Sequence, residues 1–520
     1  MKMSMLKRVL GLVLALVMAF SIVACAPVDD NKDTNPGDTT GGTEGKEPVT
    51  LIMYTYASTT QPGLQEMIQE VQRYVKEKLN VDLDLRLQSQ KEFQSTMSTR
   101  IDAGEEWDIC LVGNGVDFQT YANRNAFAPI TDYVDLLPKT TGQLIDNALD
   151  SFTIDDEVYA VPVLKDMFDR NGFTINQSLL DDLGVKFPAD YATRWDTVDF
   201  LYDLKEARDA KYPDEVDNPI IKDAMYNYDQ WFLSERLVGG WNKPIVDVNI
   251  SEDYGYKGIS LNDTAFCPVY TQEFRDLMKL VYKMVDDGIG AFDPPNFDTD
   301  NVLLNAGKLV GSCDSGLISV AEDANPNYKS AFYPSSICFA ADYTFGFSVN
   351  AKCKNVDRAV ELLELMQTDT YLATTLHFGK EGSGWTDTNN DNVIELTDKN
   401  SDPSARYWYN WYGWPLGGVT AMKAIPGSSP DMMDQMRELN KTAQAKPNRG
   451  FKFDQTPVEN ELAAVNNVYA EHYGVLCSGQ NANVDELVDN FIAELKANGM
   501  DKIIAEAQSQ LDAWRAANIK

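Results

Sequence analysis

The segment from Val49 to Val112 constrains the fold more than any other, because its apolar residues change repeatedly between a strand pattern and a helix pattern. The alternating strand-like and helix-like segments are, in order, 49–56, 64–79, 81–88, 93–101 and 107–112. Strands and helices in this order build parallel strands joined by right-handed crossovers. We therefore predict an α/β fold that opens with an open, parallel sheet.

Candidate ligand-binding residues follow two of these strands directly. In open α/β sheets, ligands bind beyond the carboxyl ends of the strands. Here the ends are followed by "YASTTQ", which begins with Tyr56, and by "GNGVDF", which contains Asn114 and Asp117. The glycines that flank Asn114 tolerate positive φ and let backbone donors approach a ligand. The alternative for the polar side chains is helix capping.

The rest of the body predicts a second region that starts near Val158. The stretch "VYAVPVLKD" is apolar and then abruptly polar, as at a crossing between domains. Its Lys165 and Asp166 are candidates for ligand contacts, and a Lys–Asp pair in the hinge is the alternative. Helical patterns follow at 196–210, 271–287, 355–369, 484–495 and 503–514.

The first 25 residues have the pattern of a lipoprotein signal peptide. Basic residues precede the apolar stretch Leu10–Val23, which is too short to span a bilayer comfortably. It ends in Ile-Val-Ala-Cys, which resembles the bacterial lipobox, so we predict a signal peptide at 1–24 and a diacylated Cys25. Residues 25–48 contain almost no apolar side chain and are expected to form a disordered tether.

Charge and cysteine content exclude several classes of function. The formal net charge is −34, which argues against nucleic acid and against anionic lipid headgroups as partners. The chain contains seven cysteines, and none of them forms a CxxC pair or a zinc-like spacing. Apart from Cys25, they form one or two disulfides or remain free thiols, and we favour free thiols.

Several stretches together resemble the substrate-binding lipoproteins of ABC importers. They are "GEEWDICLV", "YANRNAFAPITDYVDLLP", "VYAVPVLKD", "AGKLVG" and "NVDRAVELLELMQTD". In this order they resemble extracellular solute-binding protein family 1, whose members mostly bind sugars. Downstream, "RGFKFDQTPVENELAAVNNV" and "GMDKIIAEAQSQLDAW" resemble a subgroup with a C-terminal domain of unknown function.

The resemblance implies a type II periplasmic-binding-protein-like fold with two α/β lobes, each an open sheet flanked by helices, that close around a ligand at a hinge. Lobe one is expected at 49–160 plus about 300–351. Lobe two is expected at 161–299 plus about 352–520, including the C-terminal helices. The implied partners are permease subunits, and we expect a monomer on the outer face of the bacterial cell membrane.

An aromatic run, "YWYNWYGWPLG" at 407–417, suits a sugar ligand. A sugar ring offers an apolar face that stacks on indole or phenol rings, and hydroxyls that need polar side chains. Trp408, Trp411 and Trp414 are spaced by three residues and would share one face of a helix. We expect at least one of them to contact the ligand. The alternative is that all three are core residues.

Four further residues are weaker candidates for ligand contacts. Trp231 and Trp241 flank "LVGG" and provide a possible second platform, with burial in the core as the alternative. Tyr343 and Glu381 are the other two.

The stretch "DTNNDNVIELTD" matches a calcium-loop template in part. Its candidate ligands are Asp387, Asn389, Asp391, Glu395 and Asp398, at loop positions 1, 3, 5, 9 and 12. Position 6 is asparagine where the template has glycine. An Asn-rich hairpin turn explains the same residues, so a structural calcium ion is one of two interpretations of this stretch. We expect no other cofactor.

Motifs for catalysis are missing from the sequence. The two histidines lie in no HExxH motif, and the chain has no GxSxG and no phosphate-binding loop. We therefore predict a binding protein and not an enzyme: a receptor that captures an oligosaccharide and delivers it to a permease. The alternatives are a receptor for a peptide or amino compound and, in a different class, a surface glycosidase or adhesin.

Overall fold

The computed structural model describes residues 46–113, 115–145, 148–169, 171–188, 194–221, 224–225, 234–240, 243–249, 264–290, 311–315, 328–332, 339–340, 344–402, 405–410, 413–426, 428–443 and 448–518. The chain divides into two units, Met1–Gly42 and Thr43–Lys520, and the described residues all belong to the second. Within these ranges, no helix is long and apolar enough to cross a membrane.

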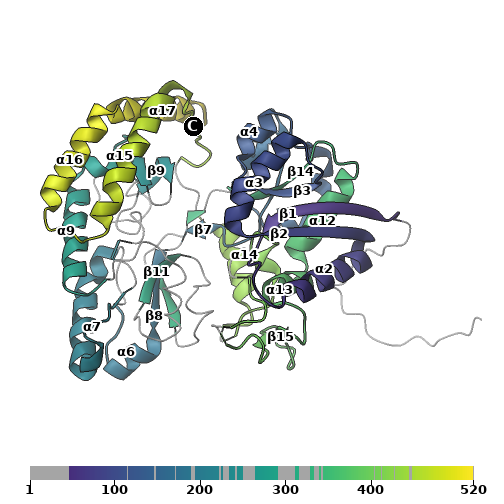
Figure 1. Ribbon diagram of the computed structural model, residues 1–520, viewed down its shortest axis with the longest axis horizontal. Coiled ribbons are helices and arrows are strands. Elements are labelled where there is room, and N and C mark those ends of the chain that lie inside the picture. The colour runs from purple at the N-terminus through teal and green to yellow at the C-terminus, as the bar shows by residue number, and fades with distance from the viewer. Residues whose placement is uncertain are drawn as a thin grey trace, which may run out of the picture. The chain divides into compact units, whose positions relative to one another are not determined.

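The predicted parallel sheet is present and has the strand order β2-β1-β3-β14-β6. Figure 1 labels the first four of these strands. Its strands are β1 (Val49–Tyr56), β2 (Val81–Gln88), β3 (Ile109–Val112), β6 (Val161–Pro162) and β14 (Gly346–Val349). β1 pairs in parallel with β2 and β3, and β14 runs antiparallel to β3 and to β6. The carboxyl ends of β1, β2, β3 and β6 therefore meet at one edge, together with the start of β14.

Helices α2 (Leu64–Leu79) and α3 (Gln90–Ala103) make the crossovers between the first three strands. α2 buries Met67, Val71 and Val75, which lie on one face at helical spacing. The Ser89 side chain accepts a hydrogen bond from the backbone N–H of Glu92 and so caps α3. This cap explains why α3 begins before the apolar pattern that predicted it.

The core of the first sheet includes residues that we expected in the second lobe. α12 (Val356–Thr368) and α13 (Thr370–Phe378) place Val360, Leu363 and Leu376 in the same buried cluster as Met53 of β1. The expected boundary, with lobe two resuming near 352, is therefore wrong at this point. The amphipathic pattern of α12 correctly predicted a helix with one buried face, but it carries no information on which sheet covers that face.

Smaller elements complete this part of the molecule. They are α4 (Phe118–Asn123), η1 (Thr131–Leu136), α5 (Pro138–Thr141), η2 (Ala148–Phe152), β4 (Thr153–Ile154), β5 (Glu157–Val158), β7 (Phe168–Asp169), β13 (Phe339–Ala340), β15 (Trp385–Thr386), β16 (Glu395–Leu396), η7 (Val419–Ala421) and α14 (Met432–Thr442). β15 and β16 form a hairpin, and its Trp385 shares a buried cluster with Met433 and Met436 of α14.

A separate buried cluster holds the second part together. Its strands are β8 (Asn171–Asn176), β9 (Ser234–Gly240), β10 (Lys243–Asn249), β11 (Gly311–Ser315) and β12 (Tyr328–Phe332). Its helices are α6 (Gln177–Leu183), η3 (Arg194–Thr197), α7 (Val198–Lys211), η4 (Pro213–Glu215), η6 (Pro268–Tyr270), α9 (Gln272–Asp286), η8 (Thr456–Val458), α15 (Glu459–Cys477), α16 (Val484–Ala497) and α17 (Met500–Asn518). The last three helices lie side by side (Figure 1).

The segment at 300–351, expected in lobe one, divides between the two parts. β11 and β12 both pair with β8, on either side of it, and β8 continues into the second cluster through Ile175. Only β14, at the end of the segment, joins the first sheet. The patterns at 303–316 and 343–351 indicate strands, which match β11 and β14, whereas β12 was not predicted. The partners of these strands could not be predicted, because pairing between distant segments leaves no local pattern.

The start of the described chain is fastened to α12. The ammonium of Lys46 lies 2.5 Å from a carboxylate oxygen of Glu361. Arg358 donates a hydrogen bond to the backbone carbonyl of Glu47 (3.0 Å), and Asn80 donates one to the carbonyl of Lys46 (2.8 Å). The body therefore holds the chain immediately before β1 begins.

The cysteines with described side chains are free thiols. They are Cys110, Cys267, Cys353 and Cys477. Burial raises the pKa of Cys267 and of Cys353 to about 12. The prediction of free thiols is confirmed for these four.

Candidate functional site

The candidate site lies at the carboxyl edge of the first sheet. Tyr56 ends β1, Gln88 ends β2, and the loop at 113–116 follows β3. Phe345 directly precedes the antiparallel strand β14, and Lys165 follows β6 by three residues. Strand topology alone therefore gathers these residues at one edge of the sheet, which is where ligands bind in open α/β sheets.

Trp414 adds an aromatic surface to this edge. Its ring centroid lies 4.4 Å from that of Phe345 and 5.9 Å from that of Tyr56, in an edge-on contact. Trp414 and Phe345 are half-buried, whereas Tyr56 is only 1% exposed. Tyr56 therefore supports the indole of Trp414 from within the core, and the expected direct contact of the Tyr56 ring with a ligand does not fit this burial.

Backbone contacts hold the aromatic run against the loop that follows β1. The Thr55 hydroxyl donates to the carbonyl of Pro415. The Gln61 amide donates to the carbonyl of Tyr409 (2.8 Å) and accepts from its N–H (2.5 Å). A Cβ at Gly63 would lie 2.8 Å from the Tyr407 carbonyl oxygen, so the chain approaches too closely there for any other residue. Trp414 is thus placed by a rigid support.

Trp408 belongs to the core, contrary to its selection as a ligand contact. Its side chain is 0% exposed, and its indole N–H donates to the carbonyl of Leu376 (3.1 Å). The Asn400 side chain accepts from the N–H of Trp408 (2.9 Å) and donates to its carbonyl (2.7 Å). The described part of the run consists of bends and turns and not of a helix, with Gly413 at φ +41°. The described residues therefore give no helical face that Trp408 and Trp414 could share.

The loop after β3 has the positive-φ glycines that the sequence predicts. Gly113 has φ +94° and Gly115 has φ +82°. A Cβ at Gly113 would lie 1.8 Å from the carbonyl oxygen of Thr344, so this loop packs directly against the residue before Phe345. Asp117 is exposed, and its carboxylate accepts from the N–H of Thr120 (2.7 Å), which is the capping alternative.

Lys165 and Asp166 form an ion pair at the same edge. Their charged groups lie 3.3 Å apart, and their side chains are 26% and 30% exposed, which leaves both accessible to a solute. Asn440 of α14 fixes the backbone around them, because it donates to the Lys165 carbonyl (2.7 Å) and accepts from the Met167 N–H (2.7 Å). This arrangement agrees with both alternatives, a Lys165–Asp166 pair in the hinge and direct contact of these side chains with a ligand.

Of the remaining predicted contacts, Glu381 does not join the group at this edge. Glu381 is exposed and forms an isolated β-bridge with Trp385. Burial, the hydrogen bond to Glu70 and, to a smaller extent, the charge of Glu381 raise the pKa of Tyr371 to about 12. The predicted contacts outside the described residues are Asn114, Trp231, Trp241, Tyr343 and Trp411.

Sequence reasoning missed two residues of the edge. Phe345 was overlooked because it lies inside the largely apolar stretch 343–351, whose pattern indicates a strand and no binding residue. Gln88 is 7% exposed, and its amide donates to Glu92 (2.9 Å) while its carbonyl oxygen has no hydrogen-bond partner within the described residues. Its place at the end of a predicted strand was the available signal.

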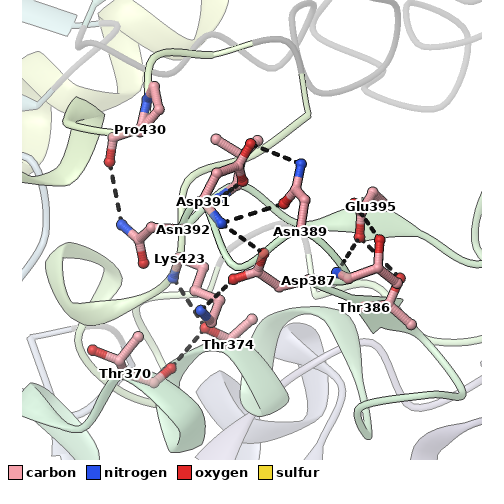
Figure 2. A network of polar contacts seen from close by, with 12 residues as sticks. Thr370, Thr374, Thr386, Asp387, Asn389, Asp391, Asn392, Glu395, Lys423 and Pro430 are labelled. Carbon is pink, nitrogen blue, oxygen red and sulfur yellow. Dashed lines mark hydrogen bonds and ion pairs between the residues drawn. The ribbon is translucent and has the colours of Figure 1, made fainter.

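Four of the five candidate calcium ligands, Asp387, Asn389, Asp391 and Glu395, lie in the β15–β16 hairpin (Figure 2), and Asp398 follows β16. The N–H of Asp391 is 3.1 Å from a carboxylate oxygen of Asp387 and 3.3 Å from the side-chain oxygen of Asn389. Asn390 and Asn392 have φ of +55° and +69°. The segment therefore has the backbone of an Asn-rich hairpin turn, which was the alternative to a calcium loop.

The carboxylates of this hairpin are satisfied by donors of the chain itself. The Lys423 ammonium lies 2.6 Å from the second oxygen of Asp387, whose pKa it holds below the ordinary value through this hydrogen bond (Figure 2). Both oxygens of Glu395 accept hydrogen bonds from Thr388, and one of them also accepts from Thr386. Asp398 is exposed. An ammonium at the first calcium position does not fit a cation cage, and calcium binding stays a prediction of the sequence.

Known proteins resemble the chain along nearly all of its length. A carbohydrate ABC transporter substrate-binding protein of Streptococcus pneumoniae serotype 4 is 22% identical over 523 residues, which cover 95% of each chain. The crystal structure of the N-glycan transport solute binding protein NgtS from Streptococcus pneumoniae is 19% identical, with a TM-score of 0.72 over 91% of this chain and 100% of that one. The complex of NgtS with Man5GlcNAc gives 0.66 at 19% identity and the same coverage.

Two family models match different parts of the chain. Residues 447–516 match a domain of unknown function, DUF3502, as the C-terminal stretches predicted. Residues 69–417 match the model of bacterial extracellular solute-binding proteins, which covers more than half of the chain. The structural likeness confirms the predicted type II periplasmic-binding-protein-like fold. The chain belongs to the bacterial extracellular solute-binding proteins, a family of extracytoplasmic binders and not of enzymes.

Proposed function

We propose that the protein is the substrate-binding subunit of an ABC importer and that it captures an oligosaccharide at the carboxyl edge of the first sheet. The observation that carries this proposal is the half-buried ring of Trp414, supported by Phe345 and Tyr56. An indole face in this position suits the C–H face of a sugar ring. The names of the similar proteins, which are carbohydrate and N-glycan binders, agree with this ligand class.

Polar groups at the same edge suit the hydroxyl groups of a sugar. The Lys165–Asp166 pair is accessible and offers both donors and acceptors. The Gln88 carbonyl oxygen still has capacity to accept a hydrogen bond. A few convergent polar groups beside an apolar surface are the general composition of small-molecule sites.

Capture proceeds by closure of two lobes, in which ligand binding favours the closed state. The two lobes correspond to the two separate groups of buried residues, one around the first sheet and one around α9 and α15–α17. No bond of the ligand is broken. The ligand is then released to permease subunits, and the receptor acts as a monomer.

The protein is held at the outer face of the cell membrane by acyl chains on Cys25. Residues 1–24 act as the signal peptide, and residues 25–48 act as the tether. Two acyl chains suffice for stable anchoring. The start of the body at Lys46 and Glu47 is fastened to α12, so the tether ends at a defined point of the fold.

A binding experiment tests the ligand class. Calorimetric titration with Man5GlcNAc, shorter oligosaccharides and a mixture of peptides should give saturable heat with a sugar. Trp414→Ala should weaken binding by about 2 kcal/mol, roughly 30-fold, as expected for a buried aromatic anchor. Trp514→Ala is the matched control, because Trp514 is also half-buried against a phenylalanine, Phe451, but lies in α17, away from the first sheet.

Three outcomes would contradict the proposal. Binding of peptides alone would assign the receptor to peptides or amino compounds. An equal loss of affinity in both tryptophan variants would remove the site from Trp414. Hydrolysis of the oligosaccharide during the titration would identify a glycosidase.

A further inference from the structure

The C-terminal helices bring together three metal-ligating side chains outside the candidate sugar site. Glu471 and His472 lie in α15, and Glu494 lies in α16. One ligand atom from each residue lies within 4.8 Å of the others. The group falls inside the segment that matches the domain of unknown function, which assigns it no role.

The contacts of His472 leave one nitrogen of its imidazole without a hydrogen bond. Its Nε2 atom is shielded from solvent and has no hydrogen-bond partner within the described residues. An oxygen of Glu494 nevertheless lies 3.2 Å from this nitrogen. The imidazole is stacked on Phe491, with centroids 5.3 Å apart and planes inclined by 14°. The ring is therefore held in place with its nitrogen toward a carboxylate.

The two carboxylates of the group also differ from their neighbours on the same helices. Glu461 of α15 is paired with Lys502, and Asp485 of α16 is paired with Arg275. Among the described residues, no lysine or arginine forms an ion pair with Glu471 or Glu494. Within the described part of the chain, the negative charge of these two carboxylates is therefore balanced by no lysine or arginine.

We propose that Glu471, His472 and Glu494 form a binding site for a divalent transition-metal ion, with zinc as the ion that fits best. Imidazole nitrogen and carboxylate oxygen bind zinc at about 2.0–2.2 Å, so two ligands of a tetrahedral ion lie roughly 3.4 Å apart. The 3.2 Å between His472 and Glu494 meets this spacing. Glu471 is exposed and reaches the ion through a change of rotamer, and water completes the coordination.

The support for this site is rigid. α15 and α16 share the second buried cluster, in which Tyr469 and Phe491 contact each other edge-on at 5.0 Å. Ligands on packed helices keep their geometry better than ligands on loops. A bound ion would join α15 to α16 on their exposed side, since Glu494 is 47% exposed and leaves a path from solvent.

Zinc titration of the metal-stripped, untagged full-length chain tests the site. Zinc chloride should bind with a stoichiometry of one and raise the melting temperature by roughly 2 °C or more at saturation, whereas magnesium should not. His472→Gln and Glu494→Gln should each weaken zinc binding by at least about tenfold. Glu486→Gln is the matched control, because Glu486 is exposed on α16 and lies outside the group.

A second readout does not depend on the variants. Histidine labelled with ¹³C at Cε1 gives two resonances, because the chain has only two histidines. Zinc should shift the resonance of His472 and leave that of His377, which is 6% exposed and buried in the first part. Equal zinc binding in wild type and His472→Gln, or zinc that leaves the His472 resonance unchanged, would overturn the proposal and leave His472 and Glu494 as a simple ion pair.

Discussion

The indole of Trp414 and the phenyl ring of Phe345 lie 4.4 Å apart between centroids, with their planes inclined by 33°. The two residues come from segments about 70 positions apart in the sequence, and the strand-end geometry of the first sheet brings them together. Partly stacked aromatic pairs of this kind stabilise each other's orientation by about 0.5–1.5 kcal/mol.

Phe345→Leu should therefore weaken ligand binding through Trp414. Leucine keeps the apolar volume but removes the ring that orients the indole, so we expect up to a tenfold loss of affinity, about 1.4 kcal/mol. Isothermal calorimetry with the oligosaccharide bound by wild type measures this loss. Unchanged affinity would show that Trp414 needs no support from Phe345.

Trp408→Ala should affect folding and not binding chemistry. The side chain is 0% exposed in the core of the first sheet, and its removal leaves a large cavity. Truncation of a buried tryptophan costs about 3–5 kcal/mol of unfolding free energy. Urea unfolding monitored by circular dichroism measures this cost. A variant of full stability that fails to bind the sugar would instead return Trp408 to the site.

His377 should make the protein less stable in mild acid. Burial lowers its pKa to about 4, below the value of about 6.5 in the unfolded chain. The unfolded state therefore binds a proton between pH 6.5 and 4 that the folded state does not, so stability falls as the pH decreases through this window. The loss attributable to His377 is at most about 3 kcal/mol at pH 4.

His377→Asn tests this pH dependence. The asparagine amide can replace the hydrogen bond from the imidazole Nδ1 to the Ala373 carbonyl (3.0 Å) without a titrating group. Melting temperatures measured from pH 7 to pH 4 should fall less steeply in the variant than in wild type. Parallel curves would contradict the assignment.

Lys423→Met should destabilise the β15–β16 hairpin. The Asp387 side chain is 4% exposed, and the variant leaves its carboxylate without the ammonium 2.6 Å away. An unpaired buried acceptor costs about 2 kcal/mol. Because Lys423 lowers the pKa of Asp387, this stabilisation is present above the unfolded pKa of about 4 and is lost as the pH falls through the folded value.

The difference between Lys423→Met and wild type should accordingly be largest at pH 7 and shrink below pH 4. Lys441→Met on α14 is the control, because Lys441 is exposed. Calcium chloride added to both proteins tests the remaining prediction of a calcium loop. If it raises the melting temperature of wild type, the hairpin binds calcium in spite of Lys423.

Cys25→Ala should release the protein from the membrane. Without the thiol there is no acceptor for the acyl chains that we propose as the anchor. Fractionation of expressing cells, followed by immunoblotting, should detect wild type in the membrane fraction and the variant in the medium. Retention of the variant in the membrane fraction would show that Cys25 is not the point of attachment.

The first sheet could be predicted from the sequence because its strands and helices are local patterns. Alternating residues in β2 and the buried face of α2 identified both elements correctly. The assignment of α12 to a lobe failed, since an amphipathic face does not name its partner. The same limit applies to Trp408 and Trp414. They are the same residue type in the same run, so the sequence could not show that the first is buried and the second half-buried.

The spacing of the tryptophans would place them on one face only in a helix, and two residues of the run itself argue against a helix. Gly413 adopts φ +41°, and Pro415 follows two residues later, so the segment turns instead of continuing as a helix. Its position is set by Gln61 and Thr55, which belong to a distant strand and loop. Contacts of this kind have no signature in a single sequence.

The fastening of Lys46 and Glu47 to α12 also determines how a mechanical load would enter the protein. The eight residues of β1 separate this attachment from Tyr56 by about 23 Å at a rise of roughly 3.3 Å per residue. A pull on the chain before Lys46 is transmitted to α12 and the amino end of β1. The loops around Trp414 lie at the opposite edge of the sheet. This load would therefore not pass through the residues that we propose to bind the ligand.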